Sequence, residues 1–582
     1  MPGRIVDHFD VVVVGAGWNG LIAARTYLEL SPTAHLLIVD DGLTIGGSWS
    51  KEKIYPNLYA QISHPLFEYS FYPMKKEGIS GDGYIPGWTV QDYLVSFARD
   101  HDLTRRTRLQ TNVVKVEKIA DCGGWSLETS SGPDITCAKL IYATGPTSSA
   151  IVPSWPQDNF VKPIVHSQHV GRHLEFIQKT VTRATVIGGA KSSFDTVFLL
   201  LKAGKKVDWI MRDSASGPLS ISAPTFLGLW NTVNHVSTRM AASFSPSIMN
   251  TSGFWYSFLQ KSLPGRALTR AYWRTATYLS AHHAGYSQSE EAEKLRPKPD
   301  GYGMFWGSGG VGIASVPDYW KVFHAGDVTI HKTEVESFSH QDVVNLKNGR
   351  SVQTDFVVLC TGFDKGYKAF SKELQEECGL YYDSDKVSKW TKLDAIAEEQ
   401  VNERLPFLKN APEFYSKATQ KSSHGPSRHY RRLIVPHLAA KGDRSILFPG
   451  LIHSVFTPLT GEIQQVPSFS HVLSPCVQAL WGAAFMLGLL DVPSQEVMEQ
   501  EAATFNAWTR KRYLEQGKKH AYFIYDYLSY IDTLMRDLKL KTNRKSNPIS
   551  EMLMPYSPQD YSGVISEFLA ARKDRARVSI EC

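Results

Sequence analysis

Three glycines and an aspartate near the N-terminus have the types and spacing of a dinucleotide-binding site. Gly15, Gly17 and Gly20 follow a run of four valines, and Asp40 ends the next apolar run. In such a pattern the first glycine permits a tight turn, the second lets the backbone approach a pyrophosphate, and the third lets a helix pack on the strand. The free N–H groups at the start of that helix favour phosphate. An acid after the second strand binds ribose hydroxyls, which favours FAD or NAD over NADP.

A second glycine turn lies farther along the chain, within residues 184–195. Gly188 holds the first position, and the small residues Ala190 and Ser193 hold the second and third. The next strand ends in Arg212, at the place that the acid holds in the first unit. A guanidinium there suits a 2′-phosphate and predicts NADPH, although a surface arginine closing a strand is the alternative. The contacts expected from this turn come from Gly188, Lys191, Ser192 and Ser193.

Two nucleotide units in one chain, acidic at the first ribose position and basic at the second, indicate hydride transfer from NADPH to FAD. The cysteines argue against a dithiol flavin enzyme, because none of the six forms a CxxC pair. No metal-ligand spacing occurs either, so we expect no metal. The cysteines are Cys122, Cys137, Cys360, Cys378, Cys476 and Cys582.

The bulk composition is that of an ordinary globular protein. The chain has 582 residues, 42% hydrophobic and 21% charged, with a net charge of +6. This length predicts two or three domains, and the small charge argues against a nucleic-acid partner. We expect no transmembrane helix, because no apolar run is long enough. Free thiols and the lack of an export signal predict a cytoplasmic location.

Two further apolar strands bracket the second glycine turn, and each ends in a Thr-Gly pair. Thr144 and Gly145 follow the strand 139–142, and Thr361 and Gly362 follow the strand 356–359. The chain therefore is expected to leave the FAD domain and return to it. The expected fold is α/β, with two Rossmann-type domains, the NADPH domain inserted into a discontinuous FAD domain, and an additional largely helical insertion. The expected segments are 1–165 (FAD domain, first part), 166–330 (NADPH domain, with the insertion at 214–316), 331–535 (FAD domain, second part) and 536–582 (peripheral C-terminal tail).

The insertion 214–316 is rich in aromatic residues and glycine and matches no nucleotide-binding pattern. We expect it to cover the active site and to exclude water. A membrane-surface patch is the less favoured alternative, because its apolar residues are not set against a lysine-rich face. A low-charge, aromatic cover favours a small apolar organic substrate over a charged one.

These motifs together resemble the flavin-containing monooxygenases, a group that also holds the Baeyer–Villiger monooxygenases, and in particular fungal biosynthetic members. The first glycine turn and Asp40 match the family's FAD fingerprint. Gly47, Ser48 and Trp49 match its Gly-Gly-x-Trp loop beside the flavin. The resemblance further assigns Val114 to the strand that meets the adenine, 143–145 to a hinge, and 448–452 and 462–464 to the segment that returns to the flavin.

The resemblance implies an enzyme that uses FAD, NADPH and O2. Reduced flavin forms a C4a-(hydro)peroxyflavin, which inserts one oxygen atom into a small organic metabolite, here in secondary-metabolite biosynthesis. Because this adduct decays to hydrogen peroxide in water, the site must be dry. The oligomeric state and the substrate itself stay open.

The chain departs from the family pattern at the flavin and in the linker. Gln61 stands where the flavin-containing monooxygenases carry an asparagine and the Baeyer–Villiger members an aspartate. Its amide keeps a donor and an acceptor for the adduct, so Gln61 is the candidate catalytic residue. In the linker motif Lys162 replaces a glycine and Val170 an aromatic residue. His166 is retained, and we expect it to fix the linker.

Two alternatives remain open at this point. Baeyer–Villiger oxidation of a ketone is one, although the missing aromatic residue at Val170 argues against that branch. The other is a non-oxygenating flavin-binding protein or NADPH oxidase. The departures from the family pattern at Gln61, Lys162 and Val170 leave this alternative open.

Overall fold

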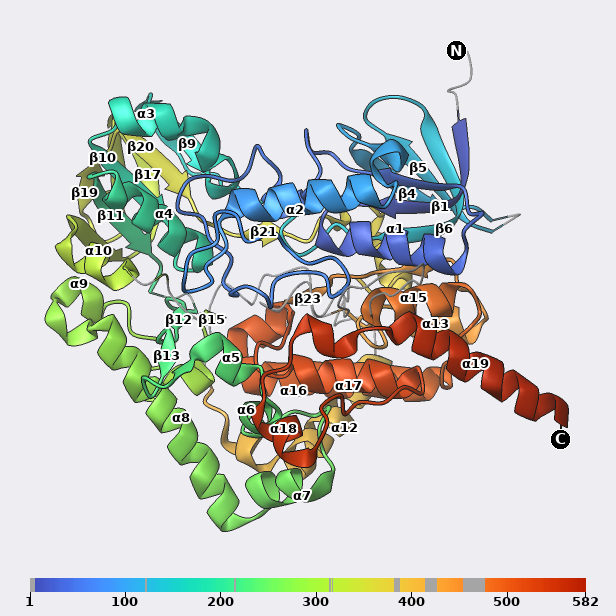
Figure 1. Ribbon diagram of the computed structural model, residues 1–582. Coiled ribbons are helices and arrows are strands. Elements are labelled where there is room, and N and C mark those ends of the chain that lie inside the picture. Colours follow the sequence, from blue (N-terminus) through green and yellow to red (C-terminus); the bar gives the residue numbers. More distant parts are fainter. Residues whose placement is uncertain are drawn as a thin grey trace.

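Two open sheets and a layer of helices make up the molecule (Figure 1). The computed structural model describes residues 6–120, 123–213, 216–312, 316, 318–380, 388–413, 427–453 and 477–581. The two sheets lie beside one another along one side of the molecule, and the helices α5–α8 and α16–α19 lie below them in this view.

The first sheet is built around β1, in which the four valines of residues 11–14 are buried. Its strand order is β3-β2-β1-β6-β5-β4, and β22 pairs in parallel with β6. β1 is parallel to both neighbours, with Val13 opposite Ile38 on one side and Ile141 on the other. Helix α1 follows β1 directly. The bounds are β1 Val6–Val14, α1 Trp18–Leu30, β2 Leu36–Val39, α2 Gly87–Asp100, β3 Thr107–Arg108, β4 Val113–Lys118, β5 Trp125–Thr129, β6 Asp134–Tyr142 and β22 Ile446–Leu447.

The second sheet repeats this arrangement, and the two-unit α/β architecture expected from the sequence is confirmed. Its order is β16-β11-β10-β20-β9, and all of its pairings are parallel. Helix α4 follows β10, as α1 follows β1. The bounds are β9 Ile164–His166, α3 Leu174–Lys179, β10 Arg183–Ile187, α4 Lys191–Lys202, β11 Lys206–Met211, α10 Tyr319–Ala325, β16 Val328–Lys332 and β20 Phe356–Leu359.

The strand pairing differs from the sequence prediction at the boundary near residue 331. Residues 331–359 were expected in the returning FAD domain, but β20 pairs with β10 and β9 in the second sheet. A further sheet, β19-β18-β17-β8, occupies the stretch between β16 and β20. The segments that connect the two sheets pair antiparallel through β7 and β21. The chain then returns to the first sheet, first where Phe370 forms an isolated bridge to Val116 of β4 and later where β22 pairs with β6. The bounds are β7 Ser149–Ala150, β8 Gln157–Phe160, β17 Val335–Gln341, β18 Val343–Leu346, β19 Ser351–Gln353 and β21 Phe363–Asp364.

The insertion is largely helical and joins C-terminal helices in one layer (Figure 1). Two short strand pairs, β12–β15 and β13–β14, also belong to the insertion. The bounds within it are β12 Ser220–Ile221, β13 Thr225–Phe226, β14 Trp230–Asn231, α5 Thr232–Val236, α6 Arg239–Ser243, α7 Gly253–Tyr256, α8 Leu263–Ala284, α9 Glu290–Glu293 and β15 Val311–Gly312.

The remaining elements follow the second sheet in the chain. They are α11 Lys372–Glu377, α12 Ser388–Arg404, α13 Pro436–Ala440, β23 Ile452–His453, α15 Val477–Met486, α16 Gln495–Lys519, β24 Ala521–Tyr522, α17 Tyr527–Asp537, α18 Pro548–Leu553 and α19 Val564–Glu581. Within the described residues, no helix is both long and apolar enough to cross a bilayer.

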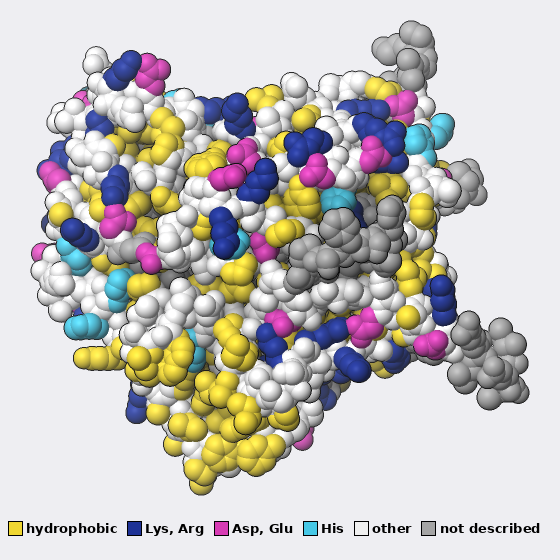
Figure 2. Space-filling model, in the orientation of Figure 1, with side chains coloured by type: hydrophobic (Ala, Val, Ile, Leu, Met, Phe, Trp, Pro, Cys, Tyr) yellow, Lys and Arg dark blue, Asp and Glu magenta, His cyan; other side chains and the backbone are white. Residues whose placement is uncertain are grey.

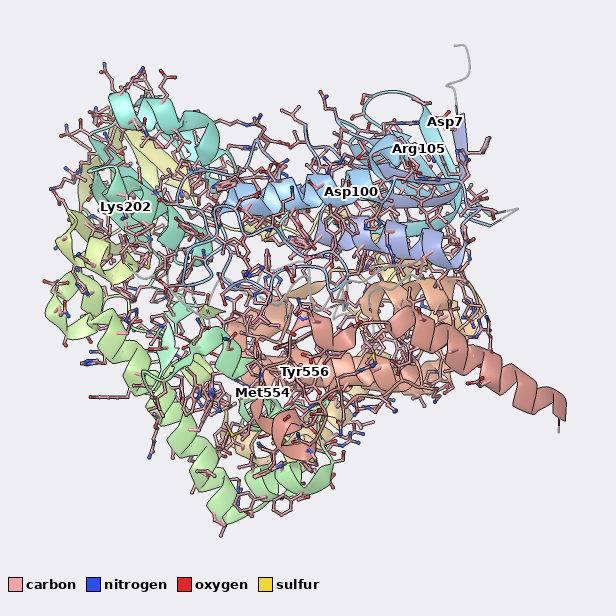
Figure 3. All side chains as sticks on the ribbon, viewed as in Figure 1. Asp7, Asp100, Arg105, Lys202, Met554 and Tyr556 are labelled. Carbon is pink, nitrogen blue, oxygen red and sulfur yellow. The ribbon has the colours of Figure 1, made fainter. Side chains whose placement is uncertain are left out.

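The C-terminal segment 536–582 is not the peripheral tail that its charge predicted. Tyr556 lies two residues beyond Met554, after α18 (Figure 3), and its side chain is fully buried, as is that of Tyr561. Glu551 of α18 and Asp532 of α17 both pair with Arg239 from the insertion. The segment is therefore packed into the core, and only the end of α19 projects from the body (Figure 1).

Candidate active site

The first glycine turn has a backbone that only glycine can adopt. Gly15 has φ +113°, and a Cβ atom on it would lie 2.6 Å from the Ala143 carbonyl oxygen. A Cβ atom on Gly20 would lie 1.8 Å from the Gly15 carbonyl oxygen, so the third glycine lets α1 pack on the turn. Helix α1 begins after Gly17 without a side-chain cap. Its first N–H groups therefore remain available to an anion.

Two other segments meet this turn. The Gly46 N–H donates to the Ala16 carbonyl (3.0 Å), which places the Gly-Gly-x-Trp loop against it. From the C-terminal half, Gly450 approaches so closely that a Cβ atom on it would lie 2.5 Å from Asn19 Nδ2. The segment after β22 thus returns to the start of α1. Residues 462–464, assigned to the same return, lie outside the described residues.

Asp40 lies beside the turn with both oxygens engaged. Oδ2 accepts from the Ala16 N–H (2.6 Å) and Oδ1 from the Gly42 N–H (2.8 Å). Burial raises the pKa of this carboxyl, although the two backbone hydrogen bonds oppose the shift. Each carboxylate oxygen has a second lone pair, so a ribose hydroxyl could still be accepted. The Thr111 N–H donates to the Asp40 carbonyl, and Val114 follows at a β-bulge, where a residue is left out of the ladder.

The second glycine turn also requires glycine at its first position. Gly188 has φ +138°, and a Cβ atom on it would lie 2.2 Å from the Cys360 carbonyl oxygen. Ser193 is buried, and its hydroxyl donates to the Ala190 carbonyl (2.6 Å), so it fills the third position as a small packing residue. Lys191 pairs with Asp195 one turn along α4 (2.5 Å). In the unbound protein its ammonium is therefore paired with a carboxylate, and its contact with a nucleotide phosphate remains a prediction.

A second basic residue joins Arg212 at the carboxyl edge of this sheet. Lys332 is the partner of Met211 in the β11–β16 ladder, so it lies next to Arg212. Arg212 is exposed, whereas Lys332 is partly buried. Burial lowers the pKa of Lys332 to about 8, and the neighbouring Lys298 adds to the shift. None of the described carboxylates forms an ion pair with Lys332.

Sequence reasoning missed Lys332, although a signal for it exists. A basic residue that ends a strand next to the Arg212 strand must lie at the same sheet edge, but the order of the strands was unknown. The pKa of Lys519, at the end of α16, is also lowered, first by burial and further by the charge of Arg212. Basic side chains from the second sheet and from the end of α16 therefore lie close together at this edge of the sheet.

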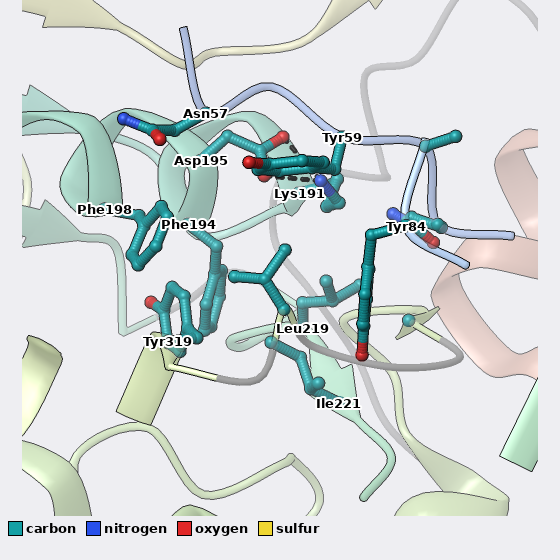
Figure 4. A pocket seen from close by; sticks show the side chains of 14 residues that line it. Asn57, Tyr59, Tyr84, Lys191, Phe194, Asp195, Phe198, Leu219, Ile221 and Tyr319 are labelled. Carbon is teal, nitrogen blue, oxygen red and sulfur yellow. Dashed lines mark hydrogen bonds and ion pairs between the residues drawn. The ribbon is translucent and has the colours of Figure 1, made fainter. Parts of the chain in front are cut away.

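A cavity of about 510 Å³, part of it open to solvent, lies where the two nucleotide units meet the insertion (Figure 4). The first unit contributes the loop 57–61 with Gln61, and the second contributes the first turns of α4. The third wall comes from the β12–β15 pair. The lining residues are Asn57, Tyr59, Ala60, Gln61, Tyr84, Lys191, Phe194, Asp195, Phe198, Leu219, Ile221, Gly312, Val316 and Tyr319.

Two side chains that line this cavity, Gln61 and Tyr319, carry a buried polar atom without a partner within the described residues. In Gln61 this atom is Oε1. An amide oxygen left in this way costs about 1–3 kcal/mol unless something bound to the protein satisfies it. The other polar pair, Lys191 and Asp195, is satisfied internally (Figure 4). Aromatic and aliphatic side chains make up most of the rest of the wall.

Comparisons with known proteins agree with this architecture. A family model described as pyridine nucleotide-disulphide oxidoreductase matches residues 12–244. The FAD-dependent monooxygenase DEP4 of Alternaria brassicicola is 58% identical over 580 residues, 99% of this chain and 97% of that protein. The FAD-dependent monooxygenase resA of Aspergillus sclerotiorum is 34% identical over 583 residues, 97% of this chain and 98% of that protein.

The chain belongs to the FAD-dependent monooxygenases. Among solved structures, an open crystal structure of cyclohexanone monooxygenase matches with a TM-score of 0.57 and 14% identity, over 91% of this chain and 97% of that one. At this identity the match concerns the fold alone. It places this FAD-dependent monooxygenase in the two-sheet architecture expected from its sequence.

The residues at the first turn fit an FAD molecule. Glycine is obligatory at Gly15 by the contact described above, and the start of α1 offers uncapped N–H groups beside Asp40. The Gly-Gly-x-Trp loop is held in place, because Ser48 Oγ bonds to Thr147 Oγ1 (2.7 Å) and Trp49 packs edge-on against Phe67. The individual cofactor contacts of this FAD-dependent monooxygenase remain predictions.

The hinge residues connect the two sheets. Thr144 Oγ1 donates weakly to the Lys365 carbonyl (3.4 Å), and Gly145 has φ +72°. Thr361 Oγ1 donates to the Ile151 carbonyl (2.5 Å), and Gly362 has φ +93°. His166 reaches the Gly362 carbonyl with Nε2 (3.1 Å), so it fixes the linker between the sheets.

Proposed function

We propose that this enzyme oxidises NADPH and inserts one oxygen atom from O2 into a small, largely apolar organic molecule. One observation carries the proposal most directly: the unpartnered Gln61 amide and the first turns of α4 face the same cavity. A reductant at the second glycine turn and a substrate near Gln61 would then meet there. We further propose a role in the biosynthesis of a fungal secondary metabolite.

FAD, when bound, supplies two-electron redox chemistry and reaction with O2, which amino-acid side chains do not offer. The chain's own residues bind, orient and exclude water. Gly15, Gly17 and Gly20 allow the backbone to approach the pyrophosphate, and Asp40 holds the ribose. Gly47, Ser48 and Trp49 support the flavin from the facing loop.

Arg212 would hold the 2′-phosphate of NADPH, with Lys332 as its neighbour. A guanidinium forms two parallel hydrogen bonds to a phosphate, and a partly buried ammonium adds a point charge. Gly188 and the uncapped start of α4 would receive the pyrophosphate. The ion pair Lys191–Asp195 lies between that turn and the cavity and holds the first turn of α4 in shape.

The walls of the cavity favour an apolar substrate. The lining includes the apolar and aromatic side chains of Phe194, Phe198, Leu219, Ile221 and Tyr319. Such a lining binds hydrocarbon surface and keeps water out, and a single amide orients the polar part of the molecule. Gln61 can donate from Nε2 and accept at Oε1, so it can hold an oxygen atom that changes its protonation state.

The proposal is tested with the purified FAD-loaded enzyme and a panel of apolar ketones, alkenes, amines and thioethers. We expect a product heavier by one oxygen atom, labelled from ¹⁸O2, and formed with NADPH faster than with NADH. A lactone or ester from the ketones alone would favour Baeyer–Villiger chemistry. NADPH oxidation that yields only hydrogen peroxide over the whole panel would support the NADPH-oxidase alternative.

A further inference from the structure

The lower corner of the molecule carries a concentration of exposed apolar side chains that the active site does not use. They come from the β13–β14 turn, from α7 and from α8. We call this set the apolar corner; it consists of Leu227, Leu229, Trp230, Phe254, Trp255, Leu263, Leu268 and Tyr278. Figure 2 shows hydrophobic side chains gathered on this corner, which protrudes from the body. Phe254 is 73% and Leu263 75% exposed, so these are not side chains at the edge of a core.

The three elements form one surface. Phe226 of β13 packs against Tyr272 of α8 with ring centroids 5.6 Å apart, and His235 Nε2 lies 3.0 Å from the Tyr272 hydroxyl. Helix α7 continues through a π-helical turn, Ser257–Lys261, into α8. Ser262 caps α8, and its hydroxyl accepts from the Gly265 N–H. The exposed aromatic and leucine side chains are therefore presented by ordered, hydrogen-bonded elements.

Cations flank this surface, and acids are missing from its sequence. Residues 214–289 contain no aspartate or glutamate. Arg266, Arg270 and Arg274 recur every four residues on α8, so they form one row along the helix. Arg270 and Arg274 are exposed and Arg266 is partly buried, and the Arg270 guanidinium carbon lies 5.7 Å from the centroid of the Phe407 ring. Within the described part of the chain, none of these three arginines forms an ion pair with a carboxylate. The sequence expectation was that these apolar residues are not set against a lysine-rich face, and the basic residues that do accompany them on α8 are arginines.

We propose that the apolar corner docks on the surface of a lipid bilayer that carries anionic headgroups. Aromatic and leucine side chains enter the interface, and the arginine row meets the phosphates. A second copy of the chain fits less well. Pairing corner to corner would bring arginine rows together with no acid from 214–289 to offset them, and like charges facing one another are costly. The protruding shape also suits insertion between headgroups better than a flat protein interface.

A second cavity, of about 350 Å³, lies next to the apolar corner. If the proposed function holds, docking at the corner would bring this cavity close to substrate dissolved in the membrane. Phe226, Tyr272 and Ala276 line it on the corner side. Ser222 and Ala223 line it on the other side, directly after Ile221, which lines the active-site cavity. An apolar substrate dissolved in a membrane would thus meet the enzyme on the side that leads toward Gln61.

The test is flotation of the FAD-loaded enzyme with phosphatidylcholine vesicles, with and without phosphatidylglycerol. We expect binding to the anionic vesicles, and weaker binding to the neutral ones. Replacing Phe254→Ser, Trp255→Ser and Leu263→Ser together should reduce partitioning by at least about tenfold. Arg270→Gln with Arg274→Gln should reduce binding to anionic vesicles by about tenfold or more and change neutral vesicles little.

Matched controls remove exposed residues of the same kinds elsewhere. Val161→Ser with Val497→Ser, and Arg350→Gln with Lys441→Gln, lie outside the corner and should leave vesicle binding unchanged. Flavin content and circular dichroism verify that each variant is folded. Equal flotation of the enzyme and the triple serine variant, or no flotation at all, overturns the proposal. So does a dimer that the triple variant abolishes while the enzyme ignores vesicles.

Discussion

Gly17 and Gly47 face one another backbone to backbone, and Gly47 leaves no room for a side chain. A Cβ atom on Gly47 would lie 2.9 Å from the Gly17 Cα, and one on Gly17 would lie 3.4 Å from the Gly47 Cα. The first glycine turn and the Gly-Gly-x-Trp loop are separate motifs in the sequence, but they contact one another directly in the fold. A side chain on Gly47 must push the two segments apart, whereas a methyl group on Gly17 would only touch the Gly47 backbone.

The first prediction follows from this contact. Gly47→Ala should lower the FAD content of the purified enzyme severely, because the new methyl group meets backbone and φ +60° is unfavourable for alanine. Gly349→Ala is the matched control: Gly349 has φ +79° but open space around its Cβ position. The control should lose about 1 kcal/mol of stability and keep its flavin. Equal flavin content in both variants, measured from the visible absorbance, would separate Gly47 from the FAD site.

The second prediction concerns Gln61. Because Oε1 has no partner within the described residues, Gln61→Ala should leave the folded protein and its flavin content intact. It should still raise hydrogen peroxide release per NADPH oxidised, since a hydrogen bond worth about 1–3 kcal/mol is lost during oxygen transfer. Gln61→Glu keeps the size but not the donor, and should uncouple as well. Product yield and peroxide are measured in the same reaction, and unchanged coupling in both variants would remove Gln61 from the mechanism.

The third prediction concerns the buried carboxyl of Glu68, which joins the first unit to the C-terminal segment. Its Oε1 accepts from Gln559 Nε2 (2.6 Å) and its Oε2 from the Met74 N–H (2.7 Å). Burial raises the pKa of Glu68 to about 7, against the effect of both hydrogen bonds. The folded state therefore holds this proton more tightly than the unfolded chain does, and the free energy of unfolding falls as pH rises from about 4.5 to about 7.

Glu68→Gln should remove this dependence, because the amide stays neutral. Its oxygen can accept from the Met74 N–H, and its NH2 group can donate to Gln559 Oε1 once the Gln559 amide has turned over. At about pH 8 the variant should be more stable than the parent by about 2–4 kcal/mol, with little difference at about pH 5. Glu399→Gln, at an exposed position on α12, is the control and should change neither value. Thermal unfolding at the two pH values is the measurement. A parallel pH dependence in parent and Glu68→Gln would contradict the raised pKa.

The sequence predicted the parts of this fold that depend on local backbone geometry. Gly15 and Gly188 each follow a buried strand and precede a helix, so short-range spacing was enough to place both nucleotide units. Pairing between distant strands was not accessible. The stretch that ends in β20 gave no sign of whether it would join β10 or β6, and the boundary near 331 was wrong for that reason.

Charge misled the interpretation of the C-terminal segment. The segment after Arg536 is rich in charges, but several of them form ion pairs such as Arg239–Glu551 and Lys545–Asp560, which accompany the burial of Tyr556. The sequence does not show which charges find partners, because those partners lie far apart in the chain and only the tertiary structure brings them together.

The last prediction concerns the choice between NADPH and NADH, and it uses Arg212 and Lys332 together. Arg212→Ala should weaken NADPH binding by about ten- to a hundredfold, since a charge-assisted contact to the 2′-phosphate is lost. NADH lacks that phosphate, so its binding should barely change. Lys332→Gln should have a similar but smaller effect, because a lysine contributes a point charge without the paired geometry of arginine.

Lys332 adds a pH signature that Arg212 cannot produce. Because its pKa is lowered to about 8 in the unbound protein, the ammonium is charged below that value and loses its proton above it. NADPH affinity relative to NADH should therefore fall as pH rises through about 8, and this fall should be absent in Lys332→Gln. Lys321→Gln, an exposed lysine on α10, is the control and should keep the parent's profile. Dissociation constants for both nucleotides are measured across this range at constant FAD content. An equal loss of NADPH and NADH binding in Arg212→Ala would mean that Arg212 supports the fold, and a flat profile in the parent enzyme would remove Lys332 from the phosphate site.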